Sequence, residues 1–175
     1  MKTWVILLRG VMPTGRNKVP MAPLRVALET GGLKDVQTYI QSGNVIARSR
    51  LGQGKIEQLV HDRIAKNFGG DIAVIARTAD QYRAILDACP FQRVETKRRY
   101  YTILGSEPDT SKASEFRKAV YAPDDIRLIG DVIYTLCNTQ YRDLKVNNTV
   151  IERRLGVAAT TRNYNTTAKL IELSS

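Results

Sequence analysis

The order of short apolar runs and amphipathic helices constrains the fold of this chain most. The run Trp4–Arg9 is apolar at consecutive positions up to Leu8 and ends in a glycine-bearing loop, which predicts a buried strand. A helix that opens at Pro20 and ends at Gly31-Gly32 follows it. Two strands, a helix and a strand come next, at Val36–Gln41, Val45–Arg48, Lys55–Phe68 and Ile72–Ala76. This is the β-α-β-β-α-β order of a ferredoxin-like unit.

The same order recurs after a connecting helix near Thr78–Ala88. In the predicted helix Ser111–Tyr121, Phe116 and Val120 face inward. The other predicted elements of this half are the strands Arg99–Leu104, Ile126–Ile129, Val132–Cys137 and Ala158–Arg162 and the helices Asp143–Leu155 and Thr166–Leu173. We therefore predict an α+β fold of two tandem ferredoxin-like halves that share a core, residues 1–77 and 98–175, joined by a connecting helix and loop at 78–97.

Composition narrows the class of protein. The chain has 175 residues and a formal net charge of +10. This charge has two interpretations: the protein contacts polyanions such as nucleic acid, or its surface is basic and only solvated. Cys89, Cys137 and His61 are too few for a zinc site of N/S ligands or a disulfide framework. Because the first apolar run is too short for a signal peptide or a spanning helix, we expect a cytoplasmic protein with no membrane contact and no cofactor.

The loop after the first strand is the nearest approach to a known binding motif. Gly10–Asn17 has the two glycines of the P-loop pattern and lies between a predicted strand and a predicted helix, as that motif requires. However, Arg16 stands in place of the P-loop lysine and Asn17 in place of its Ser or Thr. Two interpretations stay open. The loop binds an anion through backbone N–H groups, Arg16 and Lys18, or it is a tight connection in which glycines serve the backbone geometry.

Other candidates for chemistry are weaker. An RRM-type surface is disfavoured because the adjacent Tyr100 and Tyr101 must point to opposite faces of a strand and the RNP1 pattern is absent. His61 lies off the apolar stripe of its helix, which predicts a solvent-exposed side chain, whereas Cys89 and Cys137 are predicted to be small buried hydrophobic residues.

The densest cluster of basic residues next to aromatic residues comprises Lys97, Arg98 and Arg99. Such a cluster suits contact with phosphate groups.

Two sequence blocks carry a family resemblance. They are Leu8-Arg9-Gly10 with Gly15-x-Asn17-Lys18-Val19-Pro20-Met21, and Tyr39-Ile40-Gln41-Ser42-Gly43-Asn44-Val45. With a late block through Leu155-Gly156-Val157, Ala159-Thr160-x-Arg162-Asn163 and Lys169-Leu170, the chain resembles the bacterial domain of unknown function 1697 family. The resemblance implies duplicated ferredoxin-like halves and implies no activity. The chain departs from the family pattern at Val11–Thr14, where Pro13 removes one N–H donor from the loop.

We therefore predict a non-catalytic anion-binding module with nucleic acid or a phosphate-bearing small molecule as partner. A small-molecule enzyme using Lys, Tyr or carboxylate proton transfer and a protein-interaction or regulatory domain remain as alternatives. The candidate ligand residues are polar or basic and lie in turns and element ends: Arg9, Asn17, Lys18, Gln41, Ser42, Asn44, Lys145, Arg162, Asn163 and Lys169. We also predict that the loop Gly10–Val19 lies beside the turn Ser42-Gly43-Asn44, because neighbouring antiparallel strands bring both to one edge of the sheet.

Overall fold

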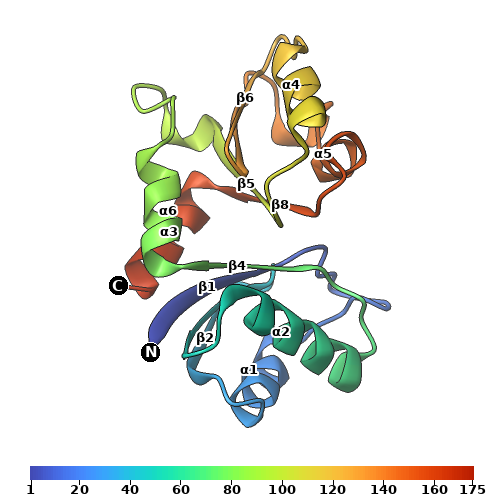
Figure 1. Ribbon diagram of the computed structural model, residues 1–175, viewed down its shortest axis with the longest axis vertical. Coiled ribbons are helices and arrows are strands. Elements are labelled where there is room, and N and C mark those ends of the chain that lie inside the picture. The colour runs from blue at the N-terminus through green and yellow to red at the C-terminus, as the bar shows by residue number, and fades with distance from the viewer. The chain divides into compact units, whose positions relative to one another are not determined.

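The computed structural model describes residues 1–175 and has a mixed α+β architecture (Figure 1). It divides into two compact units. Unit 1 comprises residues 1–84 and 170–175, and unit 2 comprises residues 85–169. Each unit holds one four-stranded antiparallel sheet, and the chain has six α-helices. The predicted α+β class with two tandem ferredoxin-like halves is confirmed.

Unit 1 has the strand order β2-β3-β1-β4, in which the central strand β1 pairs antiparallel with β3 and β4. Every residue from Trp4 to Leu8 in β1 is buried, so this strand is covered on both faces, as its consecutive apolar pattern predicted. The elements are β1 (Lys2–Leu8), α1 (Met21–Thr30), β2 (Lys34–Tyr39), β3 (Asn44–Ser49), α2 (Gln53–Phe68) and β4 (Val74–Thr78).

Helices α1 and α2 cover one face of this sheet (Figure 1), because each turns an apolar stripe toward the strands. The stripes pack with Trp4 and Ile6 of β1 into one core that includes Leu24, Leu28, Ile56, Val60 and Ile64. Gly69 ends α2 at φ 71°, a left-handed conformation that suits glycine, and its N–H donates to the Ala65 carbonyl.

Unit 2 has the equivalent order β6-β7-β5-β8, with β5 central between β7 and β8. Helices α4 and α5 pack on one face around Leu104, Phe116, Ile133 and Ile151. The elements are β5 (Arg99–Leu104), α4 (Thr110–Lys118), β6 (Asp125–Ile129), β7 (Val132–Leu136), α5 (Asn148–Leu155) and β8 (Ala159–Asn163), with short 3₁₀ turns η1 (Thr96–Arg98) and η2 (Tyr141–Asp143).

The end of α4 differs from the prediction. The helix stops at Lys118, and Ala119 is extended, so Val120 does not face inward and is 88% exposed. Tyr121, and not Val120, packs against Phe116 of the core. Its ring lies 5.1 Å from that of Phe116, and its hydroxyl donates to the Phe116 carbonyl at 2.7 Å. A tyrosine hydroxyl thus satisfies a carbonyl that the ending helix leaves without a helical partner.

The start of α5 also differs from the prediction of a helix from Asp143. Residues Tyr141–Asp143 form the separate turn η2, and α5 begins only at Asn148. Asn147 caps α5, because its side-chain oxygen accepts the Val150 N–H at 3.1 Å. An Asn cap holds its own backbone extended, so the helix cannot continue upstream.

Two further helices, α3 (Ala79–Asp87) and α6 (Tyr164–Leu173), complete the chain, and each contains a boundary between the units. Ile85 on α3 is buried, and Cys89 beyond the helix is buried as predicted. Within unit 2 the buried Tyr134 hydroxyl donates to the Ile85 carbonyl at 3.0 Å. The longest helix, α2, has 16 residues, and none of the helices is long and apolar enough to cross a membrane.

Candidate functional site

The loop after β1 and the turn between β2 and β3 lie together in unit 1, as predicted. The Leu8 N–H donates to the Gly43 carbonyl at 2.8 Å, and Gln41 Nε2 donates to the Val19 carbonyl at 3.1 Å. The register pairs Leu7 with Asn44, so the end of β1 and the start of β3 are direct neighbours. The predicted proximity of these two segments is confirmed.

Several of the predicted ligand residues in unit 1 build this loop arrangement. Asn44 is fully buried, and its Nδ2 donates to the Tyr39 carbonyl and to Ser42 Oγ, both at 3.0 Å. Asn17 holds the loop through its backbone carbonyl, which accepts the Met12 N–H at 2.9 Å. Among the cations in and next to the loop, Arg16 and Lys18 are exposed and Arg9 is half-buried.

The turn contains an unusual backbone conformation. Ile40 has φ 50°, a left-handed value that costs a β-branched residue conformational energy, and the residue is 51% exposed. This residue ends β2 at Tyr39, two residues before the predicted end of that strand. The buried Asn44 amide contacts stabilise the strained turn, because they join its two ends.

The predicted ligand residues in unit 2 also have identifiable contacts. Arg162 is 8% exposed, and its Nη1 donates to Thr160 Oγ1 at 2.8 Å and to the Thr161 carbonyl at 2.9 Å. Asn163 Oδ1 accepts the Thr166 N–H at 2.8 Å at the start of α6. Lys145 is exposed before α5, and Lys169 is half-buried in α6.

The basic cluster before β5 divides into residues of different kinds. Arg99 is 6% exposed, and its guanidinium donates to the carbonyls of Gln92 at 2.8 Å and Val94 at 2.9 Å. Arg98 is half-buried and donates through Nε to the Cys137 carbonyl at 3.1 Å. The Lys97 side chain is 77% exposed. The outward-facing charge of this cluster therefore comes from Lys97 and Arg98.

Tyr100, which follows this basic cluster in the chain, stacks on a tyrosine that the sequence did not connect with it. The rings of Tyr100 and Tyr141 lie 4.2 Å apart at an interplanar angle of 17°. Tyr100 is half-buried on β5, whereas Tyr141 on η2 is 41% exposed. Arg142 follows directly, with a side chain that is 78% exposed. We call Tyr100, Tyr141, Lys97, Arg98 and Arg142 the Tyr141 patch.

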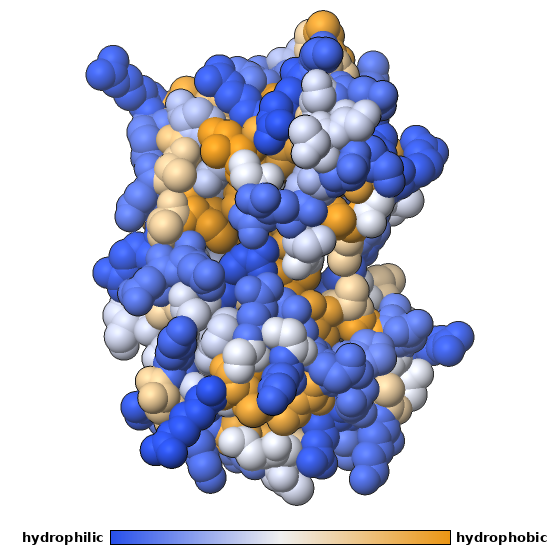
Figure 2. Space-filling model, in the orientation of Figure 1, coloured by the Kyte–Doolittle hydropathy of each residue, from blue (hydrophilic) through white to orange (hydrophobic).

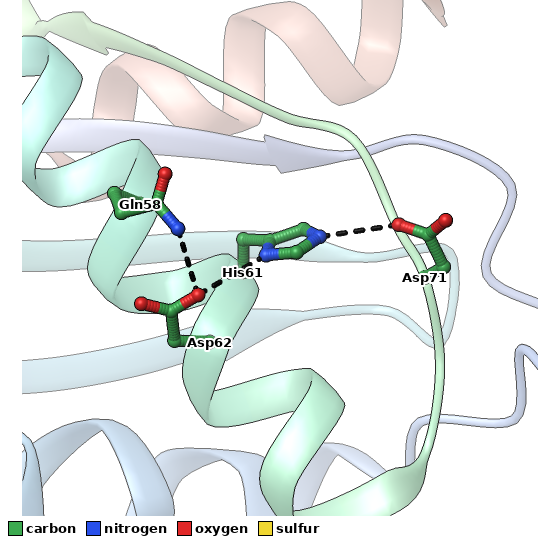
Figure 3. Close-up of polar contacts among 4 residues, drawn as sticks. All are labelled: Gln58, His61, Asp62 and Asp71. Atoms are coloured by element: carbon green, nitrogen blue, oxygen red, sulfur yellow. Dashed lines mark hydrogen bonds and ion pairs between the residues drawn. The ribbon is translucent and has the colours of Figure 1, made fainter.

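The single histidine is held between two carboxylates on the surface of unit 1 (Figure 3). His61 on α2 places Nε2 3.1 Å from Asp71 Oδ1 and Nδ1 3.3 Å from Asp62 Oδ1. Because ionised carboxylates only accept hydrogen bonds, both contacts are satisfied only by the imidazolium form. The hydrogen bond to Asp71 and then that to Asp62 raise the pKa of His61 above its usual 6.5.

We expect the proton NMR titration of His61 to give a pKa above 6.5, in a spectrum with a single histidine to assign. Asp71→Asn should lower this pKa toward 6.5, while Asp80→Asn, on another helix, should leave it unchanged. Because the folded-state pKa is raised, the stabilisation is complete below pH 6.5 and is lost as pH rises through the folded-state pKa. A His61 pKa at or below 6.5 would contradict the two-carboxylate arrangement.

Four tyrosine hydroxyls are poorly suited to abstract a proton. Burial raises the pKa of Tyr100 and Tyr121, and more strongly that of Tyr101 and Tyr134, so all four hydroxyls stay protonated at neutral pH. A catalytic tyrosine base would need the opposite shift. No group of three or more His, Cys, Asp and Glu side chains is placed to hold a metal ion.

The surface as a whole is hydrophilic over most of the face drawn in Figure 2, with apolar side chains exposed in patches. Over the whole chain, the 27 Lys and Arg residues exceed the 17 Asp and Glu residues, so the protein carries a net positive charge. A positive balance attracts polyanions but does not by itself locate a binding site. The location has to come from local geometry.

Comparisons with known proteins give a family and a similar fold. A family model described as a protein of unknown function (DUF1697) matches residues 1–134. The predicted late block, through Lys169-Leu170, lies beyond the matched residues. A solved structure of a conserved bacterial protein from Streptococcus pneumoniae is similar with a TM-score of 0.77 and 18% identity, over 99% of this chain and 98% of that one. No curated protein matches the chain.

Proposed function

The chain belongs to the DUF1697 family of proteins of unknown function, which assigns no activity, and we propose that it is a non-catalytic module that binds single-stranded nucleic acid. The observation that carries the proposal is the Tyr100–Tyr141 stack, at 4.2 Å between ring centroids. The exposed Lys97 and Arg142 lie within three residues of these tyrosines along the chain. Proteins that bind single strands combine aromatic side chains for base stacking with basic side chains that follow the backbone. The Tyr141 patch has both components.

Tyr141 is the stacking platform of this proposal. Tyr100 covers one face of its ring, and with 41% of the residue exposed the ring is accessible to a base. Turn η2 holds the ring in position, because the Leu144 N–H donates to the Tyr141 carbonyl at 3.2 Å and Leu144 itself is buried. A platform that is already stacked needs little ordering when a base arrives, which lowers the entropic cost of binding.

Lys97 and Arg142 supply the exposed positive charge of the Tyr141 patch. Their nearest carboxylates are Glu95 at 3.5 Å and Asp143 at 3.9 Å, and all four side chains are at least 60% exposed. Exposed pairs of this kind contribute little to stability and are easily exchanged for another anion. Phosphate oxygens would replace these carboxylates at small cost and release counterions from the nucleic acid.

The test is the binding of labelled single- and double-stranded DNA and RNA by fluorescence anisotropy over a range of salt concentrations. We expect single strands to bind most tightly and affinity to fall steeply with salt. Tyr141→Ala should weaken binding about tenfold, within the roughly 1–3 kcal/mol that stacking on one base contributes, and Tyr141→Phe should retain it. Lys97→Ala and Arg142→Ala should each reduce the salt slope by about 0.7.

Lys118→Ala is the matched charge control, because Lys118 is exposed on α4 and is not part of the Tyr141 patch. Its salt slope should equal that of the unmodified protein. The proposal fails if none of the four polymers binds at low salt, or if Tyr141→Ala binds single strands as the unmodified protein does. In the second case the basic charge would act without a stacking platform.

A further inference from the structure

The connection between α2 and β4 in unit 1, residues 69–73, has no regular secondary structure and lies against the loop that follows β1. The Arg9 N–H donates to the Ala73 carbonyl at 2.9 Å. A Cβ added at Gly70 would lie 3.4 Å from the Arg16 carbonyl oxygen, so the two backbones approach closely. The position of the connection therefore affects the loop after β1.

One side chain of the connection contacts helix α2 (Figure 3). Asp71 Oδ1 on the connection lies 3.1 Å from His61 Nε2 on α2. The other ring nitrogen, Nδ1, lies 3.3 Å from Asp62 Oδ1, and Asp62 belongs to α2 itself. The Asp71 contact therefore joins two segments of the chain, whereas the Asp62 contact stays within one helix. We call the former the His61–Asp71 bridge.

The His61–Asp71 bridge depends on the protonation state of the ring. A neutral imidazole has one N–H, so Nδ1 and Nε2 compete for it and only one of the two carboxylates receives a hydrogen bond. The neutral ring also gives Asp71 no opposite charge in either tautomer. Asp62 keeps a further donor in that state, because Gln58 Nε2 donates to its Oδ1 at 2.7 Å. Loss of the imidazolium proton therefore weakens the contact that joins the connection to α2.

The charged groups around the ring come from the elements that pack near it. Asp71 and then Asp62 raise the pKa of His61 through hydrogen bonds, and burial opposes them. Glu57, one turn earlier on α2, instead accepts a backbone N–H of β4 at 2.8 Å. Arg16 of the loop after β1 approaches the connection through its backbone, and its side chain is exposed. The ring thus titrates against two carboxylates.

We propose that protonation of His61 controls how firmly the α2–β4 connection is held against the loop after β1. Below pH 6.5 the imidazolium binds Asp71, and the connection stays closed. Because the bridge raises the pKa of His61, the stabilisation is complete below 6.5 and is lost as pH rises through the folded-state pKa. The device lies in unit 1 and does not depend on nucleic-acid binding by the Tyr141 patch.

Thermodynamic linkage gives the size of the effect. Protonation favours the closed connection by the same factor by which closure raises the proton affinity of His61. Asp71→Asn removes the carboxylate charge of the bridge, so the difference in His61 pKa between this variant and the unmodified protein measures that factor. Each pKa unit corresponds to a tenfold change. The opening constant of the connection should therefore increase by this measured factor as the ring loses its proton.

Amide hydrogen exchange of the full chain, followed by NMR and corrected for the intrinsic effect of pH, measures the opening. The Arg9 N–H reports on it directly, because its acceptor is the Ala73 carbonyl. We expect its opening constant to rise above the His61 pKa. The Leu8 N–H is the internal control, since it donates to the Gly43 carbonyl at 2.8 Å on the β3 side of β1. Its opening constant should stay constant.

The variants test whether the effect belongs to the bridge. His61→Gln and Asp71→Asn should each remove the pH dependence of Arg9 exchange, and the Asp71 side chain is 83% exposed, so its replacement leaves the core intact. Asp80→Asn is the matched control, because it removes an exposed carboxylate of α3 in the same unit, and it should keep the pH dependence.

Three results would overturn the proposal. An Arg9 opening constant that does not change with pH would show that the neutral ring holds Asp71 as well as the imidazolium does. Equal changes at Arg9 and Leu8 would assign the pH effect to unfolding of the whole unit. A pH dependence that persists in Asp71→Asn would assign it to another group.

Discussion

Replacing Gly43 by alanine is expected to lower the free energy of unfolding of unit 1 by about 2–4 kcal/mol. Gly43 has φ 83°, where an L residue with a side chain is strained. An added Cβ would also lie 2.8 Å from Leu8 Cβ and 2.8 Å from Val11 Cγ2, too close for ordinary packing. The two effects add at the point where the turn meets the end of β1.

Denaturant unfolding followed by Trp4 fluorescence measures this loss, because the only tryptophan lies in unit 1. Gly15→Ala is the matched control, since Gly15 has φ 79° but nothing lies within 4 Å of an added Cβ. Gly15→Ala should lower the free energy of unfolding by only about 1 kcal/mol, because it adds the conformational strain without the close contacts. Equal losses for the two variants would show that close packing at Gly43 contributes nothing.

Replacing Arg99 by alanine is expected to lower the free energy of unfolding of unit 2 by about 2–4 kcal/mol, since hydrogen bonds from charged groups are strong and the buried acceptors lose their donor. The buried guanidinium donates to the carbonyls of Gln92 and Val94 and lies 5.6 Å from the centre of the Tyr164 ring. It therefore ties the segment before η1 to β5.

Far-UV circular dichroism during denaturation measures this effect, because unit 2 contains no tryptophan. Lys97→Ala is the control, and loss of this exposed side chain should change stability by less than about 0.5 kcal/mol. Arg99→Lys should be intermediate, because an ammonium group cannot reproduce the planar fork of a guanidinium. If Arg99→Ala kept full stability but lost nucleic-acid binding, Arg99 would be a contact residue and not a structural one.

The two stability experiments separate residues that the sequence groups together. Lys97, Arg98 and Arg99 are consecutive and basic, and the sequence offers one interpretation for all three. The structure gives Arg99 a buried structural role, Arg98 a partial one and Lys97 none. Burial depends on where the strand begins and on what the loop before it covers, which three adjacent side chains cannot reveal.

The elements themselves were predictable, because helix and strand periods and the Gly and Pro positions that interrupt them are local properties. β5 begins at Arg99 and ends at Leu104, as its apolar pattern predicted. The errors lie at element ends with a specific local structure. Ile40 enters a left-handed turn and ends β2 two residues before its predicted end. Asn147 caps α5, which begins five residues after the predicted start of that helix.

For the candidate ligand residues, the sequence predicted the position in the fold but not the contacts. The sequence predicted that the loop after β1 meets the turn before β3, because antiparallel neighbours share an edge of the sheet. Its candidate ligands Gln41 and Asn44 proved to hold that loop and turn together, since their amides pair with backbone carbonyls. Sequence position identified where polar groups gather but not what each one contacts.

The α+β class, the order of the elements and the buried central strand of unit 1 follow from the sequence. The stacking of Tyr141 on Tyr100 and the presence of Trp4 and Arg50 in one cavity lining follow from tertiary contacts. These partners lie about forty or more positions apart in the chain. Their meeting depends on strand register and on where loops return, whereas periodicity reports only on residues within a few turns of each other.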